Sequence, residues 1–212
     1  MLTNRDKEII RALNKFRVMD RDSIGELFFA GLKNPKYAAN NVLLRLMRDG
    51  QIKRSTAFVP YVYFGPDVDI KHNSAKIGHW LGILDVYKEL LKLGELESFM
   101  VEPVYGRKDD GYARPDIYCY FRRTPFFVEV QKTRYSQRQI EEKLNRYAAL
   151  FRSGVLTDQQ TRVLILSDHR YAIEGDYPFR IFQAESFTQF VWSLKGQAAE
   201  KSATSGIKVM VK

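Results

Sequence analysis

The sequence predicts an α+β chain of two domains, and three observations lead to this. Residues 1–68 hold three short helical patterns followed by an alternating pattern typical of a hairpin. Residues 73–195 have the order helix, three strands, helix, strand, which favours a mixed sheet covered by helices. Between the two blocks, "PDVDIKHNSAKIGH" loses the apolar periodicity, as a linker does. Residues 196–212 have the composition of a loose C-terminal tail.

Each helix of the first domain has a start signal. Thr3 is a good N-cap, and Asp6 lies three residues later in the capping-box position. Asp20 or Asp22 can cap a second, short helix, and Asn34 can cap a third. The apolar stripe expected to bury the third helix consists of Tyr37, Ala38, Val42, Leu43 and Leu46.

The stretch "QIKRSTAFVPYVYFGP" alternates like a hairpin, with Val59, Tyr61 and Tyr63 expected on one face of its second strand. Three helices closed by a hairpin is the plan of a winged helix-turn-helix, whose third helix enters the DNA major groove. Amide side chains can bind adenine edges, and cations can bind phosphates or guanine. The predicted DNA-binding residues are Lys36, Asn40, Asn41, Arg45 and Arg48 of the third helix and Lys53 and Arg54 of the wing. The alternative is a solvated polar face on a protein-interaction module.

The chain has a formal net charge of +9, which attracts phosphate backbones or anionic membrane surfaces. No apolar run is long enough to span a bilayer, and the N-terminus is charged where a signal peptide would be apolar. Cys119 is the only cysteine, so no internal disulfide is expected and a reducing cytoplasm fits best. Double-stranded DNA is therefore the expected partner, and no membrane contact is expected. A homodimer is one expected assembly, although no heptad seam predicts it.

The second domain begins with a long helix expected over residues 73–93. The next segments, "SFMVEPVYG", "PDIYCYF" and "PFFVEVQKT", are predicted as strands, and "SQRQIEEKLNRYAALF" is predicted as an amphipathic helix. The apolar run "TRVLILSD" is typical of a buried central strand. A last strand and a terminal helix are expected in "FRIFQAESFTQFVWSL".

Two carboxylates lie on neighbouring predicted strands, with two arginines at the turn between them. Whether the turn is "RR" or "RRTP", Asp116 and Glu129 share one sheet face, either directly opposite or one diagonal step apart. Cross-strand neighbours lie about 5 to 8 Å apart, so the two side chains can share a hard divalent cation. Gln131 points to the same face, where its carbonyl can orient a water or face the metal.

Pro115-Asp116 on one strand and Glu129-Val130-Gln131 on the next resemble the motif of the PD-(D/E)XK nuclease superfamily. The resemblance implies a restriction-endonuclease-like α/β domain with a mixed sheet. In that superfamily the acids bind magnesium, for which manganese is a substitute. The metal activates water and stabilises charge on the phosphate. Asp116 and Glu129 are thus the implied metal ligands and catalytic acids.

The sequence departs from the superfamily pattern at one position. The residue two after the Glu is usually Lys, but here it is Gln131, while Lys132 should point to the other face. Some members carry Gln there and others take the lysine from the next helix, which implies catalytic roles for Gln131 and Lys143. On the same resemblance, Tyr147 is a site neighbour and Glu89 is a candidate extra acid.

Joined to the winged helix, the whole chain resembles the replication-relaxation family of Gram-positive plasmids and mobile elements. The resemblance implies a DNA-binding protein of a plasmid or mobile element that acts in replication, relaxation or its control. The alternative function is a magnesium-dependent DNA endonuclease, a nickase, that uses Asp116 and Glu129. A vestigial site, with the fold kept and the chemistry lost, is the alternative interpretation of these two acids.

Overall fold

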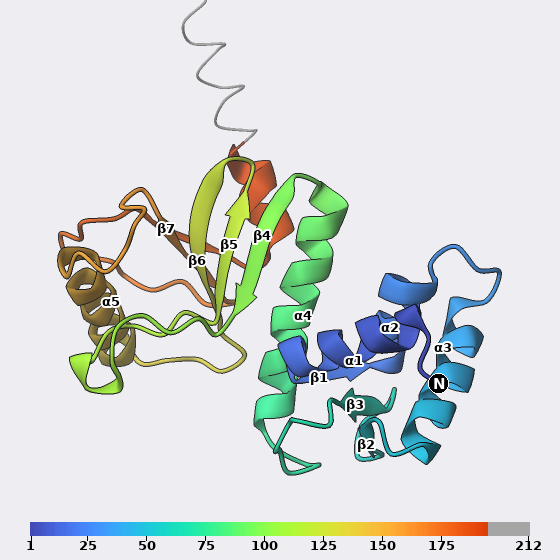
Figure 1. Cartoon of the computed structure of the whole chain (residues 1–212). Helices are drawn as coiled ribbons and strands as arrows, with labels where there is room; N and C mark the ends of the chain where they lie inside the picture. Colours follow the sequence, from blue (N-terminus) through green and yellow to red (C-terminus); the bar gives the residue numbers. More distant parts are fainter. Residues whose placement is uncertain (195–212) are drawn as a thin grey trace, which may run out of the picture. The chain divides into compact units, whose positions relative to one another are not determined.

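The computed structural model describes residues 1–194, and the predicted tail at residues 196–212 lies outside them (Figure 1). Contacts divide the chain into two units, Met1–Asp85 and Val86–Lys212. The division falls within α4 (Lys76–Leu93), later than the sequence predicts, since the predicted domains end at residue 68 and begin at residue 73. Each unit has its own sheet, of three strands in unit 1 and five in unit 2. No helix of residues 1–194 is long and apolar enough to cross a membrane.

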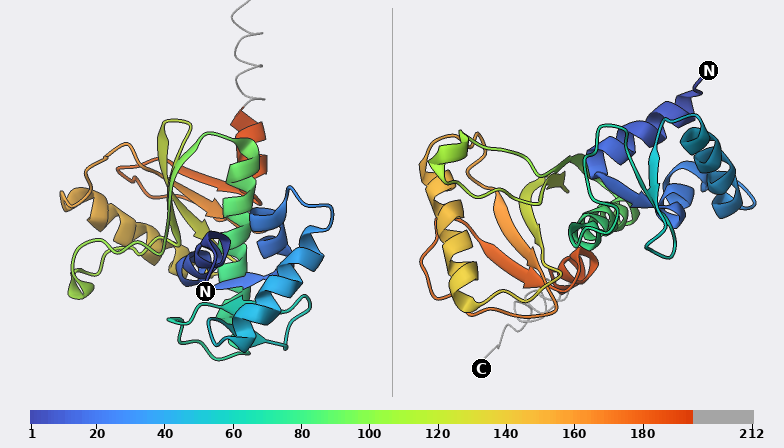
Figure 2. Two further views of the ribbon diagram at one scale, coloured as in Figure 1. Left: turned by 45° about the vertical axis from the view of Figure 1, so that its right-hand side comes forward. Right: turned by 90° about the horizontal axis from the view of Figure 1, so that it is seen from below.

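Unit 1 confirms the three predicted helices (Figure 2). It also confirms their caps. Side chains of Thr3, Asp20 and Asn34 each accept a hydrogen bond from a backbone N–H in the first helical turn. The elements are α1 (Asn4–Phe16), β1 (Val18–Asp20), α2 (Arg21–Phe29), α3 (Pro35–Arg48), β2 (Lys53–Ser55) and β3 (Val62–Phe64). The strand order is β1-β3-β2, and both pairings are antiparallel. Strand β1 is not predicted by the sequence, because three residues are too few to show alternation.

Two expectations about side-chain burial in unit 1 are wrong. The buried residues of α3 are Ala39, Leu43 and Leu46, whereas Tyr37 is 65% exposed. The expected face of Val59, Tyr61 and Tyr63 does not form, because β3 begins only at Val62 and Val59 is 97% exposed. All three residues of β3 are buried, since it is the central strand of its sheet.

An ion pair between a buried carboxylate and a half-buried arginine links α1 to α3. The Arg45 guanidinium donates to the Asp6 carboxylate at 2.7 Å, and Asp6 is 1% exposed. The backbone N–H of Thr3 donates to the other Asp6 oxygen at 2.8 Å, which completes the predicted capping box. Burial alone would raise the pKa of Asp6, but the bonds from Arg45 and Thr3 outweigh burial and lower that pKa below its ordinary value of 3.8.

This lowered pKa predicts how stability depends on pH. The charged Asp6 contributes stability above its ordinary pKa, and the contribution is lost as the pH falls through the lowered value. We expect Asp6→Asn to lower the unfolding temperature at about pH 7 and to lower it less at about pH 3. Thermal unfolding at both values checks this, with Asp69→Asn, an exposed acid, as the matched control. An equal loss at both pH values would contradict the role of the charge.

Unit 2 confirms the predicted mixed sheet, with strand order β4-β5-β6-β7-β8. Strands β4, β5 and β6 pair antiparallel, and β6, β7 and β8 pair parallel. The elements are β4 (Leu96–Val101), a 3-10 turn (Lys108–Asp110), β5 (Ile117–Phe121), β6 (Thr124–Val130), α5 (Gln137–Arg152), β7 (Arg162–Leu166) and β8 (Ile181–Ala184).

Alternate residues of β6 face opposite layers. Phe127 packs against Tyr147 and Phe151 of α5, whereas Phe126 packs against Phe187 and Phe190 of the last described helix. Helix α5 therefore covers one face of the sheet, as both views show (Figures 1 and 2). The side-chain period of two places Glu129, like Phe127, on the α5 face.

Candidate functional site

The turn between β5 and β6 decides how the two carboxylates meet. Phe121 pairs with Thr124, so the turn contains only Arg122 and Arg123, both with positive φ. Contacts outside the turn hold this backbone: Arg122 donates to the Leu93 carbonyl at 2.9 Å, and the Arg123 N–H donates to Glu97 at 3.0 Å. Ile117 pairs with Val128, so Asp116, one residue earlier, lies directly opposite Glu129, one residue later.

Asp116 is the residue just before β5, and it is the more exposed of the two acids. Its Oδ2 accepts a hydrogen bond from the Val130 N–H at 2.8 Å, which holds the carboxylate over the end of β6. Its backbone carbonyl accepts from the Glu102 N–H at 2.8 Å. The side chain is half-buried, so one carboxylate of the pair stays accessible from outside.

Glu129 is 1% exposed, and both of its carboxylate oxygens accept hydrogen bonds from α5. The Lys143 ammonium donates to Oε2, and the Tyr147 hydroxyl donates to Oε1. Lys143 and Tyr147 are four residues apart, so they project from one face of the helix. Ser136 and Gln139 form the capping box that begins α5 and sets this face. The structure thus brings together, from separate elements, four of the side chains that the nuclease resemblance implies at the site: Asp116, Glu129, Lys143 and Tyr147.

Burial and the neighbouring Asp116 carboxylate raise the pKa of Glu129 to about 8. Burial alone would lower the pKa of Lys143, but the carboxylates of Glu129 and Asp116 outweigh burial and raise it. Burial and the same Glu129 carboxylate raise the pKa of Tyr147 well above its ordinary value. The lysine therefore stays charged beside two acids, and Glu129 holds a proton more readily than an exposed Glu does.

Gln131 lies beside this cluster, but its carbonyl is already used. The Tyr171 hydroxyl donates to the Gln131 carbonyl at 2.8 Å, and it accepts from the Tyr135 N–H at 3.0 Å. The Gln131 Nε2 group is buried and has no hydrogen-bond partner among residues 1–194. The free group is thus a donor, which suits a water or phosphate oxygen, rather than the carbonyl that the sequence suggested.

Tyr135 and Tyr171 were not anticipated from the sequence. Tyr135 lies just before α5, with its ring 5.9 Å from the Lys143 ammonium. Tyr171 lies in the loop between β7 and β8 and is buried. A single tyrosine in an irregular loop carries no periodic signal, so no sequence pattern could have placed Tyr171 against Gln131.

Two carboxylates could hold a magnesium-type cation only if solvent and substrate completed its shell. Asp116 and Glu129 provide carboxylate oxygens, and Mg²⁺ is commonly bound through one or two carboxylates plus waters and phosphates. Among residues 1–194, no three His, Cys, Asp or Glu side chains gather closely enough to hold a metal by themselves. The candidate extra acid, Glu89, is used elsewhere: it accepts from the N–H of Thr188 at 2.9 Å and from its hydroxyl at 3.0 Å.

The predicted DNA-binding residues of unit 1 divide by exposure. Lys36 and Arg48 have side chains 63% and 77% exposed, and Asn41 is exposed. Asn40 is half-buried, and Arg45 is held by Asp6, so a phosphate contact by Arg45 stays a prediction. The outward face of α3, defined here as Tyr37, Asn41, Leu44 and Arg48, follows helical spacing. Tyr37 and Leu44 are 65% and 50% exposed, although Tyr37 was expected in the buried stripe and Leu44 was not singled out in the sequence.

The hairpin between β2 and β3 places its two predicted cations differently. Lys53 is exposed and donates to the Val68 carbonyl at 3.2 Å. The Arg54 guanidinium lies 4.9 Å from the centroid of the Tyr61 ring. The connecting residues 56–61 contain no lysine or arginine, so the positive charge of this hairpin is at its base.

A scan against models of protein families gives no match for this chain. Searches of curated proteins and of solved structures give no match either. The functional assignment therefore depends on the residues and their geometry.

Proposed function

We propose that this chain binds duplex DNA through the outward face of α3, in the replication of a plasmid or mobile element or in its control. The observation that carries the proposal is the exposed arginine, amide and aromatic set on one face of α3. An arginine and an amide can bind base edges, and apolar side chains can contact the thymine methyl group.

The arrangement around α3 supports a winged helix-turn-helix. Three helices and a small antiparallel sheet follow the order α1-β1-α2-α3-β2-β3, with the β2–β3 hairpin directly after α3. In that motif the third helix enters the major groove and the hairpin contacts the backbone. Exposed Lys53 at the base of the hairpin suits a phosphate contact. The replication role itself rests on the resemblance to the replication-relaxation family.

Duplex binding is tested by titrating the full chain into a fluorescent duplex at several salt concentrations. A phosphate-binding protein releases counterions, so the logarithm of the binding constant should fall linearly with the logarithm of the salt concentration. Binding without salt dependence, or no binding at low salt, would favour the protein-interaction module instead.

A second function, metal-dependent cleavage of a phosphodiester, is favoured by the contact between Lys143 and Glu129. Through this contact α5, the helix after β6, provides a cation beside Asp116 and Glu129. The position where the nuclease superfamily usually has lysine is occupied by Gln131, which is neutral. A bound magnesium would activate water and offset charge on the phosphate. Lys143 would stabilise negative charge that develops beside Glu129, and Tyr147 would hold the Glu129 carboxylate in place. Gln131 Nε2 would donate to a water or phosphate oxygen.

Metal binding itself is expected to raise the thermal stability of the chain. A ligand that binds only the folded state should add about 1 to 3 kcal/mol when present at ten to a hundred times its dissociation constant. Unfolding with and without magnesium or manganese measures the gain. Asp116→Asn should abolish it, and Asp109→Asn, at an acid outside the site, should leave it unchanged. A melting temperature indifferent to both metals would support the vestigial interpretation.

A further inference from the structure

Hydrogen bonds through three side chains join β8 to the end of β6. The residues are Gln183 of β8, Tyr171 of the loop between β7 and β8, and Gln131, the residue after β6. Tyr171 is 6% exposed and packs in the same apolar cluster as Ile140 and Leu144 of α5. We call Gln183, Tyr171 and Gln131 the Tyr171 network.

Gln183 fixes the backbone of Tyr171. Its side-chain carbonyl accepts from the Tyr171 N–H at 2.8 Å, and its NH2 group donates to the Tyr171 carbonyl at 3.0 Å. Gln183 pairs with Ile165, and Ile165 pairs with Glu129, so these three residues lie at one level of the sheet. Because the side chains of paired residues point to the same face, Gln183 lies on the same face as Glu129. A residue of an irregular loop is thereby attached to the sheet at the level of Glu129.

Gln131 is attached to the sheet as well. Its backbone N–H donates to the Leu166 carbonyl at 2.9 Å, which continues the pairing of β6 with β7 by one residue. Its side chain points to the same face as that of Glu129, two residues earlier, and the residue is 9% exposed. The amide of Gln131 is therefore buried at the next position along the face that carries Glu129.

The Tyr171 hydroxyl determines which way the Gln131 amide is turned. This hydroxyl accepts from the Tyr135 N–H at 3.0 Å, and it donates its one proton to the Gln131 carbonyl at 2.8 Å. A reversed amide would place its NH2 group against the hydroxyl and leave the buried hydroxyl proton without an acceptor, which costs free energy. The Gln131 carbonyl is therefore kept on Tyr171, and the NH2 group is turned away from it.

The NH2 group of Gln131 is the part of the network that is open to a ligand. Its nitrogen, Nε2, is buried and finds no hydrogen-bond partner within residues 1–194. Buried polar groups are normally hydrogen-bonded, so this donor favours an oxygen acceptor. An N–H donor cannot coordinate a metal ion, and the carbonyl that could do so is bonded to Tyr171. The Gln131 amide thus suits an oxygen atom of an anionic ligand rather than a metal.

We propose that Gln183 and Tyr171 are positioning residues, which hold the Gln131 amide so that Nε2 donates to a phosphodiester oxygen bound at Asp116 and Glu129. A phosphodiester is the anion that this acid pair would bind through magnesium. The role of the Tyr171 network rests on the second function proposed above, but it requires only that the phosphodiester binds, not that it is cleaved.

The test follows the side-chain amide of Gln131 by nuclear magnetic resonance. The full chain, labelled with ¹⁵N, is titrated with the dinucleotide TpT, which has a single phosphodiester, in the presence of magnesium. The Gln131 NH2 signals are identified by their absence from the spectrum of Gln131→Met. In the wild type we expect these signals to shift as TpT binds, because the NH2 group gains a charged phosphate oxygen as its acceptor.

Two variants remove the bonds that position Gln131. Tyr171→Phe removes the hydroxyl, and Gln183→Met removes both bonds to the Tyr171 backbone at a similar side-chain length. Each should weaken TpT binding about tenfold and reduce the shift of the Gln131 signals, because the amide is no longer held in one orientation. Backbone signals report whether each variant is folded. Gln183→Met keeps the Tyr171 hydroxyl, so it provides the test if Tyr171→Phe does not fold.

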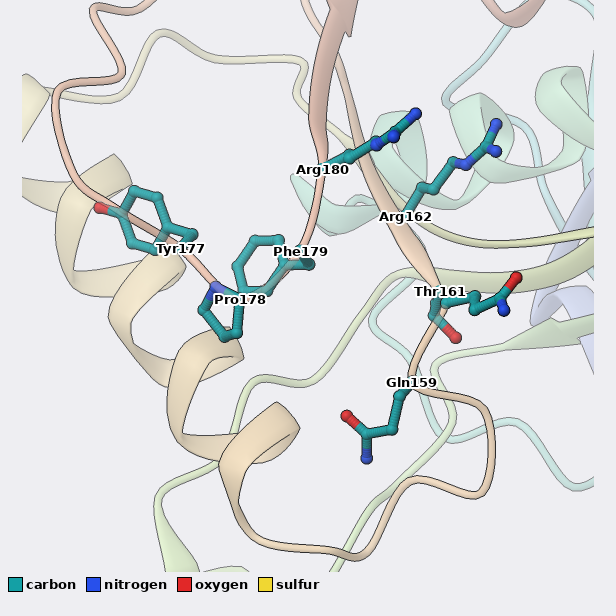
Figure 3. A pocket seen from close by; sticks show the side chains of 8 residues that line it. Gln159, Thr161, Arg162, Tyr177, Pro178, Phe179 and Arg180 are labelled. Atoms are coloured by element: carbon teal, nitrogen blue, oxygen red, sulfur yellow. The ribbon is translucent and has the colours of Figure 1, made fainter.

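Tyr177→Phe is the matched control. Tyr177 is half-buried in the same loop, and in the described structure it forms no hydrogen bond to Gln131. It lines the pocket shown in Figure 3, where its ring centroid lies 5.6 Å from that of Phe179. Because its hydroxyl is not part of the Tyr171 network, this variant should bind TpT like the wild type.

The outcomes separate the positioning role from cleavage. Loss of the Gln131 shift in Tyr171→Phe and Gln183→Met, but not in Tyr177→Phe, would support the role whether or not the chain nicks plasmid. Failure of the wild type to bind TpT with magnesium, unmoved Gln131 signals at saturating TpT, or equal shifts in all of these proteins would overturn it. Nicking of plasmid together with unmoved Gln131 signals would keep the second function and reject only the positioning role.

Discussion

Asp116→Asn is expected to slow magnesium-dependent nicking of supercoiled plasmid at least a hundredfold, about 2.7 kcal/mol of barrier. The variant keeps an oxygen that can accept from the Val130 N–H, so the end of β6 should keep its structure. What it loses is the negative charge opposite Glu129, on which the proposed metal binding would depend. Nicking is measured by the conversion of supercoiled to open circular plasmid at one metal concentration.

Lysine variants separate the effect of Lys143, the cation that α5 places beside Glu129, from the effect of the general positive charge of the chain. Lys143→Ala should lose at least tenfold in rate, because the cation beside Glu129 is removed. Lys132→Ala removes an exposed lysine just beyond β6 and should nick like wild type. Equal nicking rates for the two variants would rule out a catalytic role for Lys143. If wild type leaves the plasmid intact with magnesium and with manganese while still binding it, the enzyme hypothesis fails and the vestigial interpretation holds.

Tyr37→Ala combined with Arg48→Ala is expected to weaken duplex binding about a hundredfold, about 2.7 kcal/mol. Both side chains are exposed on the outward face of α3, so their loss should remove groove contacts without opening the core. If Arg48 contacts a phosphate, the slope of the salt dependence should also decrease by about 0.9. Fluorescence anisotropy at several salt concentrations measures both quantities.

Arg11→Ala is the matched control for the charge that this double variant removes, because Arg11 is an exposed arginine of α1. It should bind the duplex nearly as wild type does. Equal losses in the control and in the double variant would mean that general charge, not the face of α3, attracts the DNA. Arg45→Ala is a poor substitute, since it breaks the ion pair with buried Asp6 and so tests folding as well.

Local signals determined the elements that carry the candidate sites. The cap at Thr3 with Asp6, and the cap at Asn34, act within one helical turn, so the sequence alone predicts where α1 and α3 begin. Alternation predicts which strand residues share a face, which is why the sequence alone places Asp116 and Glu129 together. The helical pattern of α5 is equally local, and its spacing puts Lys143 and Tyr147, which the nuclease resemblance implied, on one face.

Contacts between distant segments decided the rest. The sequence allowed two registers for Asp116 and Glu129, and the two-residue turn, held by bonds to Leu93 and Glu97, selected the directly opposite one. Tyr37 looked like a core residue until the packing of Ala39, Leu43 and Leu46 turned it outward. Parallel pairing placed Gln183 level with Glu129, although the two lie far apart in sequence. Local residue patterns determine where helices begin and which residues share one face of a helix or strand. Only the pairing and packing of distant segments determine which of these faces meet.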